Sequence, residues 1–303
     1  MRINAKEVSP VKVLDPADIA RQYRGEVRER IKASRRRLKL VGFLSSESSP
    51  SKTYSSYTQA GCEDVGIDFE LRHPGRLGLE AAIDEANADD SVHGIIVYYP
   101  IFGGEQDRYL KDLVDVRKDI EGLNSFWARK LYHNERYIDL GHTKKAILPC
   151  TPLAVIKLLE STRDFGGPQS MEGKTATIFN RSEVVGRPLA SMLANDGARV
   201  YSFDITGPLL FEKGQVFETN ISREEALKDS QVVITGVPSR EFPLVSAKEI
   251  CANAVCINVS TLKNFADDIA EKALVMVPRV GPMTVAMALR NTLRLYDNYH
   301  KGG

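Results

Sequence analysis

The stretch Thr177–Leu193, "TIFNRSEVVGRPLASML", has the pattern of a strand, a tight loop and a helix. Apolar residues recur at helical spacing from Val185 onward, and Pro188 suits a first helical turn. Such units often bind nucleotides, because the helix N-terminus presents free backbone N–H groups to phosphates. The usual glycine-rich fingerprint is missing, and Gly186 is the one glycine in the loop. Periodicity alone therefore leaves open an ordinary strand–helix unit whose loop binds nothing.

A carboxylate stands where a dinucleotide site needs one. The next predicted strand ends at Asp204, at a spacing from Gly186 that suits an acid on the adenosine ribose. Next to a 2′-phosphate, this acid would cost about 1–4 kcal/mol at 4 Å, depending on the dielectric. Ile205 offers a phosphate no hydrogen bond. Arg181 argues the other way, since a guanidinium pairs well with phosphate, unless it turns toward Asp204 or the pyrophosphate. We expect NAD rather than NADP, with a plain turn acid as the alternative for Asp204.

Strands and helices alternate in both halves of the chain, which predicts parallel sheets covered by helices. We expect an α/β protein of two domains, the second Rossmann-like, with the active-site cleft between them. The first domain is predicted to span residues 1–149 plus the C-terminal helix 282–303, and the second residues 150–281, with a connector helix from Cys150 to Thr162. The predicted strands are "LKLVGFL", "IDFEL" and "HGIIVYYP" in the first domain and "TATIF", "RVYSF", "QVVITG", "AVCINV" and "LVMVP" in the second.

Composition excludes several classes of partner. The 41 basic and 40 acidic residues nearly cancel, so we expect neither nucleic acid nor an anionic membrane as a partner. The basic run from Lys32 to Leu40 is interpreted as a solvated helix end. No stretch approaches the 18 apolar residues that a membrane span requires, and the N-terminus lacks an apolar signal segment. The four cysteines form no CxxC pair, which predicts no metal site and a cytoplasmic protein with reduced thiols.

Five motifs, in order, match a known family. "NRSEVVGRP" (180–188) closely resembles the "GRSxxVGxP" loop of the methylenetetrahydrofolate dehydrogenase/cyclohydrolase family, with Asn180 where most members carry glycine. "GIIVYYP" (94–100), "KDIEGLN" (118–124), "PCTP" (149–152) and "VGPMTVAMAL" (280–289) resemble the other four family motifs. The resemblance covers nearly the whole chain and is strongest to fungal, monofunctional, NAD-dependent members.

The resemblance implies a function in one-carbon metabolism and purine biosynthesis. A hydride would pass from 5,10-methylenetetrahydrofolate, in polyglutamylated form, to NAD and leave 5,10-methenyltetrahydrofolate. It further implies a cytosolic homodimer. The residues expected to bind NAD are Arg181, Ser182, Val185, Gly186, Asp204, Ile205, Val237, Pro238, Val259, Ser260 and Thr261. Those expected to bind folate are Tyr54, Tyr98, Glu121, Gly281, Pro282 and Thr284, and those expected in the catalytic group are Cys150, Tyr98, Glu121, Tyr54 and Thr58.

Hydride transfer needs positioning rather than a general acid or base. The protein must hold the pterin, with a carboxylate for its N–H donors and an aromatic ring to stack on. Glu121 and Tyr54 are our candidates, together with Tyr98, since one of Tyr98 and Tyr99 should face the site while the other joins the core. Asp119 is the less favoured acid, with a turn carboxylate as its alternative.

One departure from the family concerns the hydrolytic step. Bifunctional relatives carry a lysine four residues after the tyrosine at position 54, on the same helix face, where this chain has Thr58. Tyr98 replaces the glutamine that interacts with that lysine, and Lys52 points elsewhere on the helix. We therefore expect a dehydrogenase without cyclohydrolase activity. The alternatives are a bifunctional enzyme and an NAD-binding regulatory protein that has lost catalysis.

Two residues carry open interpretations. Cys150 begins the connector helix, where a nucleophile would have a lowered pKa. The reaction needs no covalent step, so we interpret Cys150 as a residue that lines the site near the nicotinamide. Arg279 stands where relatives have glycine, and it could reach the folate tail or alter its loop.

Overall fold

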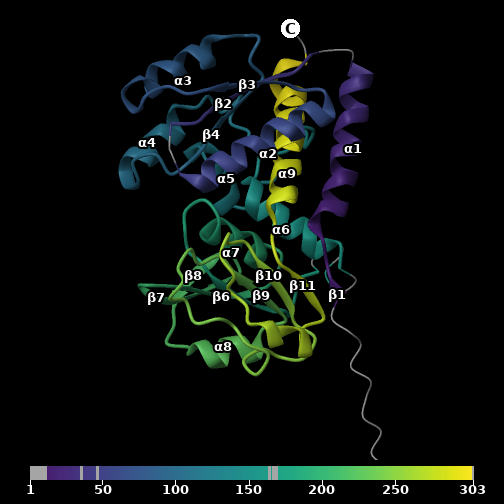
Figure 1. Ribbon diagram of the computed structural model, residues 1–303, viewed down its shortest axis with the longest axis vertical. Helices are drawn as coiled ribbons and strands as arrows, with labels where there is room; N and C mark the ends of the chain where they lie inside the picture. Colours follow the sequence, from purple (N-terminus) through teal and green to yellow (C-terminus); the bar gives the residue numbers. More distant parts are fainter. Residues whose placement is uncertain (1–11, 35–36, 46–47, 163–164, 166–169, 302–303) are drawn as a thin grey trace, which may run out of the picture. The chain divides into compact units, whose positions relative to one another are not determined.

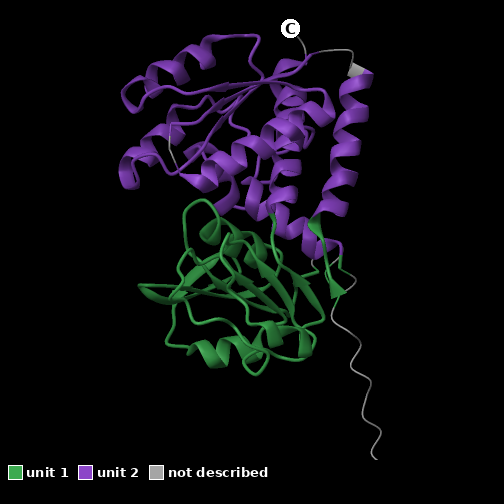
Figure 2. Cartoon of the chain, in the orientation of Figure 1, with its two compact units in different colours: residues 1–16, 162–280 green, residues 17–161, 281–303 purple. Residues whose placement is uncertain are grey.

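The computed structural model describes residues 12–34, 37–45, 48–162, 165 and 170–301. The chain forms two compact units, drawn in different colours in Figure 2. Unit 1 comprises residues 1–16 and 162–280, and unit 2 comprises residues 17–161 and 281–303. The boundary therefore follows the connector helix, whereas the sequence placed it before that helix, at residue 149. The α/β class and the two-domain organisation are as predicted.

Unit 2 is built on a three-stranded parallel sheet in the order β3-β2-β4 (Figure 1). All residues of β4 are buried, and so are four of the five in β2, because helices cover the sheet. The strands of unit 2 are β2 (Lys39–Phe43), β3 (Asp68–Arg72) and β4 (Gly94–Val97). Its helices include α1 (Pro16–Ser34), α2 (Ser49–Val65), α3 (Leu79–Ala88), α4 (Gly104–Leu113), α5 (Ser125–Tyr132), α6 (Cys150–Glu160) and α9 (Gly281–Leu295).

Glycines allow close packing on this sheet. A Cβ atom on Gly42 would lie 2.8 Å from the Phe69 ring, and one on Gly94 would lie 2.6 Å from a methyl group of Ile120. The space above these two strands is therefore filled by neighbouring side chains. The buried cluster on this sheet includes Val41, Phe43, Ile83, Ile95 and Val97.

Helix α9 explains why the connector helix belongs to unit 2. Eleven of its fifteen residues are buried, and it packs against both α6 and α2. Helix α6 is also largely apolar, with buried residues on several faces. An apolar helix of this kind is stable only inside a core, and the C-terminal helix supplies that contact. One π-helical turn, Tyr296–His300, follows α9.

Unit 1 contains a mixed eight-stranded sheet in the order β1-β11-β10-β9-β5-β6-β7-β8. The pairs from β1 to β6 are parallel, while β6–β7 and β7–β8 are antiparallel. The predicted parallel sheet is present from β1 to β6, and β7 and β8, which were not predicted, extend it with antiparallel pairs. Its elements are β1 (Lys12–Val13), β5 (Thr175–Phe179), α7 (Gly186–Asn195), β6 (Arg199–Asp204), β7 (Gly207–Glu212), β8 (Gln215–Glu218), α8 (Arg223–Asp229), β9 (Val232–Thr235), β10 (Val255–Asn258) and β11 (Val275–Val277).

The additional strands form a hairpin that turns at Lys213 and Gly214, both with positive φ. Such dihedrals match the twist of a two-residue hairpin, and Gly214 adopts them without steric conflict. Two short helices were also missed. Asn124 caps α5 through its side chain, and Ser222 and Glu225 form a capping box on α8.

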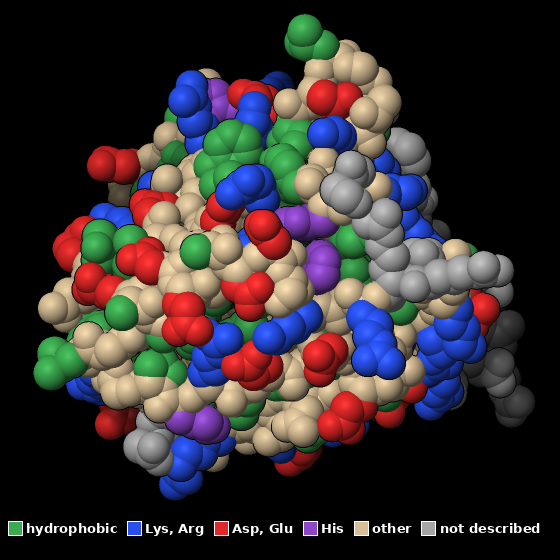
Figure 3. Space-filling model, turned by 90° about the horizontal axis from the view of Figure 1, so that it is seen from above, with side chains coloured by type: hydrophobic (Ala, Val, Ile, Leu, Met, Phe, Trp, Pro, Cys, Tyr) green, Lys and Arg blue, Asp and Glu red, His purple; other side chains and the backbone are tan. Residues whose placement is uncertain are grey.

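The surface carries no dominant charge on the face drawn in Figure 3, where basic and acidic side chains intermingle over most of the area. Helix α1 ends at Ser34 within the basic run, and Arg37 beyond it is exposed. Arg35 and Arg36 lie outside the described residues.

Candidate functional site

The loop between β5 and α7 is organised by the side chain of Asn180. Its Oδ1 atom accepts hydrogen bonds from the Ser182 backbone N–H, the Ser182 hydroxyl and the Gly186 N–H, at 2.9, 2.7 and 3.1 Å. Its Nδ2 atom donates to the carbonyl of Gly236 at 2.7 Å, which ties the loop to the end of β9. The asparagine that departs from the family pattern thus holds the loop closed.

Gly186 fits this loop because it lacks a side chain. A Cβ atom there would lie 1.9 Å from the Asn180 carbonyl oxygen. Gly186 is the first residue of α7, and Val185 immediately precedes the helix. The exposed Ser182 lies in the same loop. A pyrophosphate binds to the free N–H groups of a helix N-terminus and requires that the loop backbone can come close to it. These residues therefore fit a dinucleotide.

The predicted ribose acid lies at the carboxyl end of β6. Asp204 keeps 39% of its side chain exposed, and its Oδ1 atom accepts a hydrogen bond from the Ile205 N–H at 2.8 Å. Arg181 does turn toward Asp204, with Nε 3.9 Å from Oδ2. Ile205 is fully exposed beside it. A carboxylate with a free edge at this position can accept hydrogen bonds from a ribose diol.

The ends of β9 and β10 bring the remaining predicted cofactor residues together. The Asn264 side chain accepts from the Val237 N–H at 2.9 Å and donates to the Val237 carbonyl at 3.1 Å, and the Ser260 hydroxyl donates to that same carbonyl at 3.1 Å. Asn258 accepts from the Ser260 N–H at 3.2 Å. The neighbours Pro238, Val259 and Thr261 are at least partly exposed on these two loops.

In unit 2, Asp119 and Glu121 lie on one loop but differ in role. Asp119 is 4% exposed, and its carboxylate accepts backbone hydrogen bonds from Glu121, Gly122 and Asn124 at 2.8–3.0 Å. Burial raises the pKa of this carboxyl to about 6, against the lowering effect of those N–H donors. Asp119 is therefore a turn carboxylate that shapes the loop, the alternative that the sequence left open.

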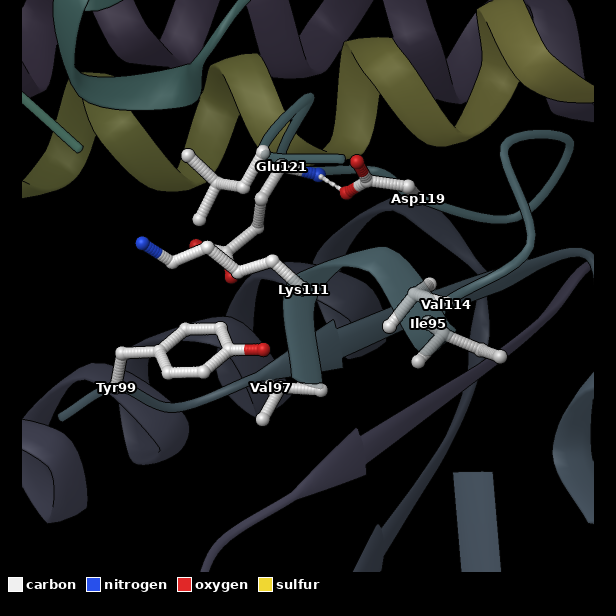
Figure 4. A pocket seen from close by; sticks show the side chains of 8 residues that line it. Ile95, Val97, Tyr99, Lys111, Val114, Asp119 and Glu121 are labelled. Atoms are coloured by element: carbon white, nitrogen blue, oxygen red, sulfur yellow. Dashed lines mark hydrogen bonds between the residues drawn. The ribbon is translucent and has the colours of Figure 1, made fainter. Parts of the chain in front are cut away.

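Glu121 is the carboxylate that the loop leaves available. Burial and, secondly, the charge of Asp119 raise its pKa to about 8, while Lys111 opposes the shift. Glu121 lines a small pocket together with Tyr99 and Lys111, and these three side chains gather on one side of it (Figure 4). The Lys111 ammonium lies 5.4 Å from the centre of the Tyr99 ring. Asp119 also lines the pocket, and the rest of the wall is apolar: Ile95, Val97, Val114 and Leu123.

The predicted aromatic residues form a perpendicular pair. The rings of Tyr54 and Tyr98 lie 5.5 Å apart at an interplanar angle of 88°. Tyr98 is 2% exposed, and Tyr99 lines the pocket, so Tyr98 belongs more to the core than predicted. The hydroxyls of Tyr54, Tyr98 and Tyr99 are buried without a hydrogen-bond partner. Buried hydroxyls without a partner are rare in proteins, so these three hydroxyls are candidates to bond a polar ligand.

Thr58 lies on α2 below this aromatic pair. It is fully buried, and its hydroxyl donates to the Tyr54 carbonyl at 2.9 Å. Burial raises the pKa of the Tyr98 phenol. Position 58 has neither solvent access nor an ionisable nitrogen. Lys52, which could otherwise replace the missing lysine, is exposed on the same helix.

Cys150 begins α6 as predicted but is protected. It is 3% exposed, its thiol donates to the Ile120 carbonyl at 3.3 Å, and Asn291 Nδ2 approaches the sulfur at 3.6 Å. Burial, together with Glu121 and Asp119, raises the pKa of this thiol well above its ordinary value. A protonated, buried thiol is a poor nucleophile, in agreement with the non-covalent interpretation.

The residues expected near the folate at the start of α9 also lie in unit 2. Gly281 and Pro282 are partly exposed, and the Thr284 hydroxyl lies 3.3 Å from that of Thr151 on α6. Arg279 belongs to unit 1, where its guanidinium lies 3.9 Å from Asp15. Both side chains are largely exposed, and a role of Arg279 at the folate tail stays a prediction.

Several residues that hold the two sites were missed by the sequence reasoning. Asn291 donates to the carbonyls of Ile120 and Leu148, both at 2.9 Å, and fixes the loop that carries Glu121. A polar residue on the buried stripe of the last helix was the available signal. Lys111 gave no signal, because it occupies an ordinary surface position of an amphipathic helix.

Within the part of the chain that the structure describes, no group of three or more His, Cys, Asp or Glu side chains could hold a metal ion. In the same part of the chain, no helix is long and apolar enough to cross a membrane.

The fold of unit 1 and its loop define a dinucleotide-binding α/β protein. Family models identify it further: the chain matches the catalytic domain of tetrahydrofolate dehydrogenase/cyclohydrolase over residues 14–121 and the NAD(P)-binding domain of the same proteins over residues 149–300. The chain therefore belongs to the tetrahydrofolate dehydrogenase/cyclohydrolase family, which confirms the resemblance described above.

Individual relatives are similar over nearly their whole length. The chain is 43% identical over 297 residues to a methylenetetrahydrofolate dehydrogenase (NAD+) of Dictyostelium discoideum, with 94% of each chain covered. It is 46% identical over 278 residues to the protein of the same name from Saccharomyces cerevisiae, with 86% of each covered. The solved structure of the NAD-dependent 5,10-methylenetetrahydrofolate dehydrogenase from Saccharomyces cerevisiae matches with a TM-score of 0.89 and 41% identity, over 97% of this chain and 99% of that one.

Proposed function

We propose that this protein oxidises 5,10-methylenetetrahydrofolate to 5,10-methenyltetrahydrofolate by hydride transfer to NAD. The observation that carries the proposal is that one chain of this family contains both a site suited to a dinucleotide and a site suited to a pterin. Unit 1 contains Asp204 and a loop too tight for any side chain at Gly186. Unit 2 contains Glu121 and the buried tyrosine hydroxyls. The relatives named NAD-dependent dehydrogenases, at 43% and 46% identity, support the same reaction.

The residues of unit 1 would hold the cofactor. NAD, when bound, supplies the hydride acceptor. Asp204 accepts hydrogen bonds from the adenosine ribose, and the N-terminus of α7, with Gly186 as its first residue, stabilises the pyrophosphate. Val237 and Ser260 form the wall at the ends of β9 and β10, where Asn264 fixes their backbone.

The residues of unit 2 would hold and orient the folate. Glu121 accepts hydrogen bonds from the N–H donors of the pterin, and each of these donors favours the ionised carboxylate. Tyr54, Tyr98 and Tyr99 carry hydroxyls that lack a partner, and these can bond polar atoms of the substrate. The methylene carbon loses its hydride as a cation shared by two nitrogens, so no side chain has to donate or accept a proton. Cys150 stays a protonated thiol that lines the site.

We further propose that the protein lacks cyclohydrolase activity. Hydrolysis of the methenyl product requires a positioned water and a group that assists its proton transfer. Thr58 is buried and bonded to the Tyr54 carbonyl, so its hydroxyl cannot replace an ammonium group.

The direct experiment measures the absorbance of NADH and of methenyltetrahydrofolate together after mixing protein, NAD and methylenetetrahydrofolate. We expect NADH and methenyltetrahydrofolate to form in equal amounts, and NADP to be at least 10-fold less effective in kcat/KM. A second assay follows the decay of methenyltetrahydrofolate. NAD binding without NADH formation would instead support a regulatory protein, and catalysed decay would support a bifunctional enzyme.

We also propose a homodimer. The edge strand β8 exposes Val216 and Phe217, by 49% and 48%, at the end of the eight-stranded sheet. An edge strand with exposed apolar side chains is a ready site for pairing with another chain. Light scattering on the eluting peak of a gel-filtration column tests the dimer, and Phe217→Lys should shift the mass toward one chain.

A cytoplasmic location and a polyglutamylated substrate complete the proposal. The four cysteines are unpaired, which suits a reducing compartment. Cell fractionation tests the location. Comparing KM for monoglutamyl and pentaglutamyl substrates tests the second point, with a lower KM expected for the longer tail.

A further inference from the structure

The guanidinium of Arg181 is held where β6 passes into β7, by acceptors from β6, from the turn and from the first residue of β7. Nη2 donates to the Thr206 hydroxyl at 2.5 Å and to the Gly207 carbonyl at 2.8 Å, and Nη1 donates to the Ser202 carbonyl at 3.3 Å. Only 8% of the Arg181 side chain is exposed. Thr206 supplies the one side-chain acceptor among these three bonds. The turn itself consists of Ile205 and Thr206, between the end of β6 and the start of β7.

Because of these bonds, the Arg181 guanidinium is not available to pair with a 2′-phosphate. Guanidinium groups bind phosphate through two parallel N–H bonds. Both terminal nitrogens of Arg181 already donate to protein acceptors, and Nε faces Asp204 at 3.9 Å. To pair with a phosphate, the side chain would have to leave these acceptors and rotate outward.

Two features therefore disfavour NADP, and they act differently. Asp204 repels a 2′-phosphate directly. The β6–β7 turn removes the attraction that Arg181 would otherwise supply. Replacing Asp204 alone removes the repulsion but gives the phosphate no cation to pair with. Freeing Arg181 alone provides the cation but leaves the phosphate beside the Asp204 carboxylate. The two changes should reinforce each other, because each removes an obstacle that limits the effect of the other.

We propose that Thr206 is a positioning residue for cofactor choice, whose hydroxyl holds Arg181 against the β6–β7 turn and so favours NAD over NADP. The inference rests on the proposed use of NAD by this site. The ligand class is an adenosine nucleotide with a free 2′-hydroxyl, in contrast to one with a 2′-phosphate.

Calorimetric titration of the full chain with 5′-AMP and with 2′,5′-ADP tests this without folate or turnover. The variants are Thr206→Val, which removes the hydroxyl at equal shape, Thr206→Ser, which keeps it, Asp204→Asn and the double variant D204N/T206V. Thr206 is exposed, so these changes should not disturb folding. Thr219→Val, at a partly buried threonine after β8 whose hydroxyl accepts from the Ile221 N–H, is the matched control.

We expect T206V to tighten 2′,5′-ADP binding about 3–10-fold and to leave 5′-AMP binding within about 2-fold. T206S and T219V should behave like the unchanged protein. D204N/T206V should exceed the product of the two single effects at least about 3-fold. Binding of 2′,5′-ADP to T206V should also weaken more steeply with added salt, because a new ion pair forms.

A T206V protein that keeps the original affinity ratio would overturn the inference, and so would an equal change in T206S. That result would leave the proposed dehydrogenase untouched, because NADH formation is measured separately. Conversely, absent NADH formation together with the expected nucleotide shifts would reject the reaction but keep the role of Thr206. If the protein without substitutions binds neither nucleotide and forms no NADH, both proposals are rejected.

Discussion

A Cβ atom added to Gly186 would lie 1.9 Å from the carbonyl oxygen of Asn180. The same asparagine bonds three donors of the loop through its side chain, so the backbone at Gly186 cannot move away without breaking those bonds. The turn is tight because Asn180 fills the space next to residue 186, and only glycine, which has no side chain, fits there.

Gly186→Ala should therefore abolish NAD binding and destabilise unit 1 by roughly 2–4 kcal/mol, because the new methyl group overlaps the backbone. Fluorescence titration with NADH and urea denaturation measure the two effects. Gly25→Ala in α1 is the matched control, since no atom lies within 4 Å of a Cβ there. That change should stabilise the protein by up to about 1 kcal/mol. Normal NADH binding by G186A would show that the loop does not contact the cofactor.

Cofactor preference should move when the ribose edge is rebuilt. Asp204→Ser combined with Ile205→Arg removes the repelling carboxylate and places a cation at a fully exposed position. We expect the ratio of kcat/KM for NADP over NAD to rise at least about 10-fold, as a new phosphate–arginine pair replaces a like-charge contact. Steady-state assays with both cofactors provide the measurement, and Ile205→Arg alone serves as the control. An unchanged ratio in the double variant would mean that the ribose lies elsewhere.

Glu121 should give the reaction a pH dependence. Its pKa in the free protein is raised to about 8 by burial and by Asp119, against Lys111. The pterin needs the ionised form, so kcat/KM should rise with pH and level off above about 8. Glu121→Gln should lower kcat/KM roughly 100-fold or more and remove this rise. Glu135→Gln, at an exposed glutamate, should keep the original profile. A pH-independent kcat/KM in the unchanged protein would argue against pterin binding by this carboxylate.

The Glu121 carboxyl should also make the free energy of unfolding depend on pH. Stability should fall as the pH rises, whereas kcat/KM should increase. Because the folded-state pKa of the carboxyl lies above the ordinary value of 4.5, the folded protein holds a proton that the unfolded chain releases. Stability contributed by this group is thus complete below about pH 4.5 and is lost as the pH rises toward 8. In thermal melts without ligands, E121Q should become more stable relative to the unsubstituted protein as the pH rises across this range. The difference should reach roughly 1–3 kcal/mol after allowance for partial exposure. A constant difference in melting temperature would contradict the raised pKa.

Introducing a lysine at position 58 tests the proposed loss of hydrolysis. Thr58→Lys alone places an unpaired ammonium group in a fully buried position, so it should destabilise unit 2 by roughly 2–4 kcal/mol and give no cyclohydrolase activity. Adding Tyr98→Gln makes room and supplies an amide partner. The double variant should recover part of the stability and hydrolyse methenyltetrahydrofolate measurably. Thermal melts and the methenyl decay assay follow both effects, and activity in the unchanged protein would refute the interpretation of Thr58.

Much of the fold was predictable because local patterns report local structure. The β5–loop–α7 unit around Gly186 follows from helical spacing and one proline, and the parallel strands follow from short apolar runs. The β7–β8 hairpin was missed, because Lys213-Gly214 is a weaker turn signal than asparagine-glycine and β8 is exposed along its whole length. Helix α8 is only seven residues long, too short for a clear periodicity.

The sequence by itself determined the family, the cofactor loop and the candidate acids, because those depend on residue identity and spacing along the chain. Only the tertiary structure separated the roles of Asp119 and Glu121. Both line the pocket, but Asp119 accepts three backbone N–H bonds from its own loop, whereas Glu121 lies beside Tyr99 and Lys111. The same holds for Arg181, whose acceptors Ser202, Thr206 and Gly207 lie 21 to 26 residues later in the chain. Hydrogen-bond partners and burial arise from contacts between distant segments, which spacing along one segment does not encode.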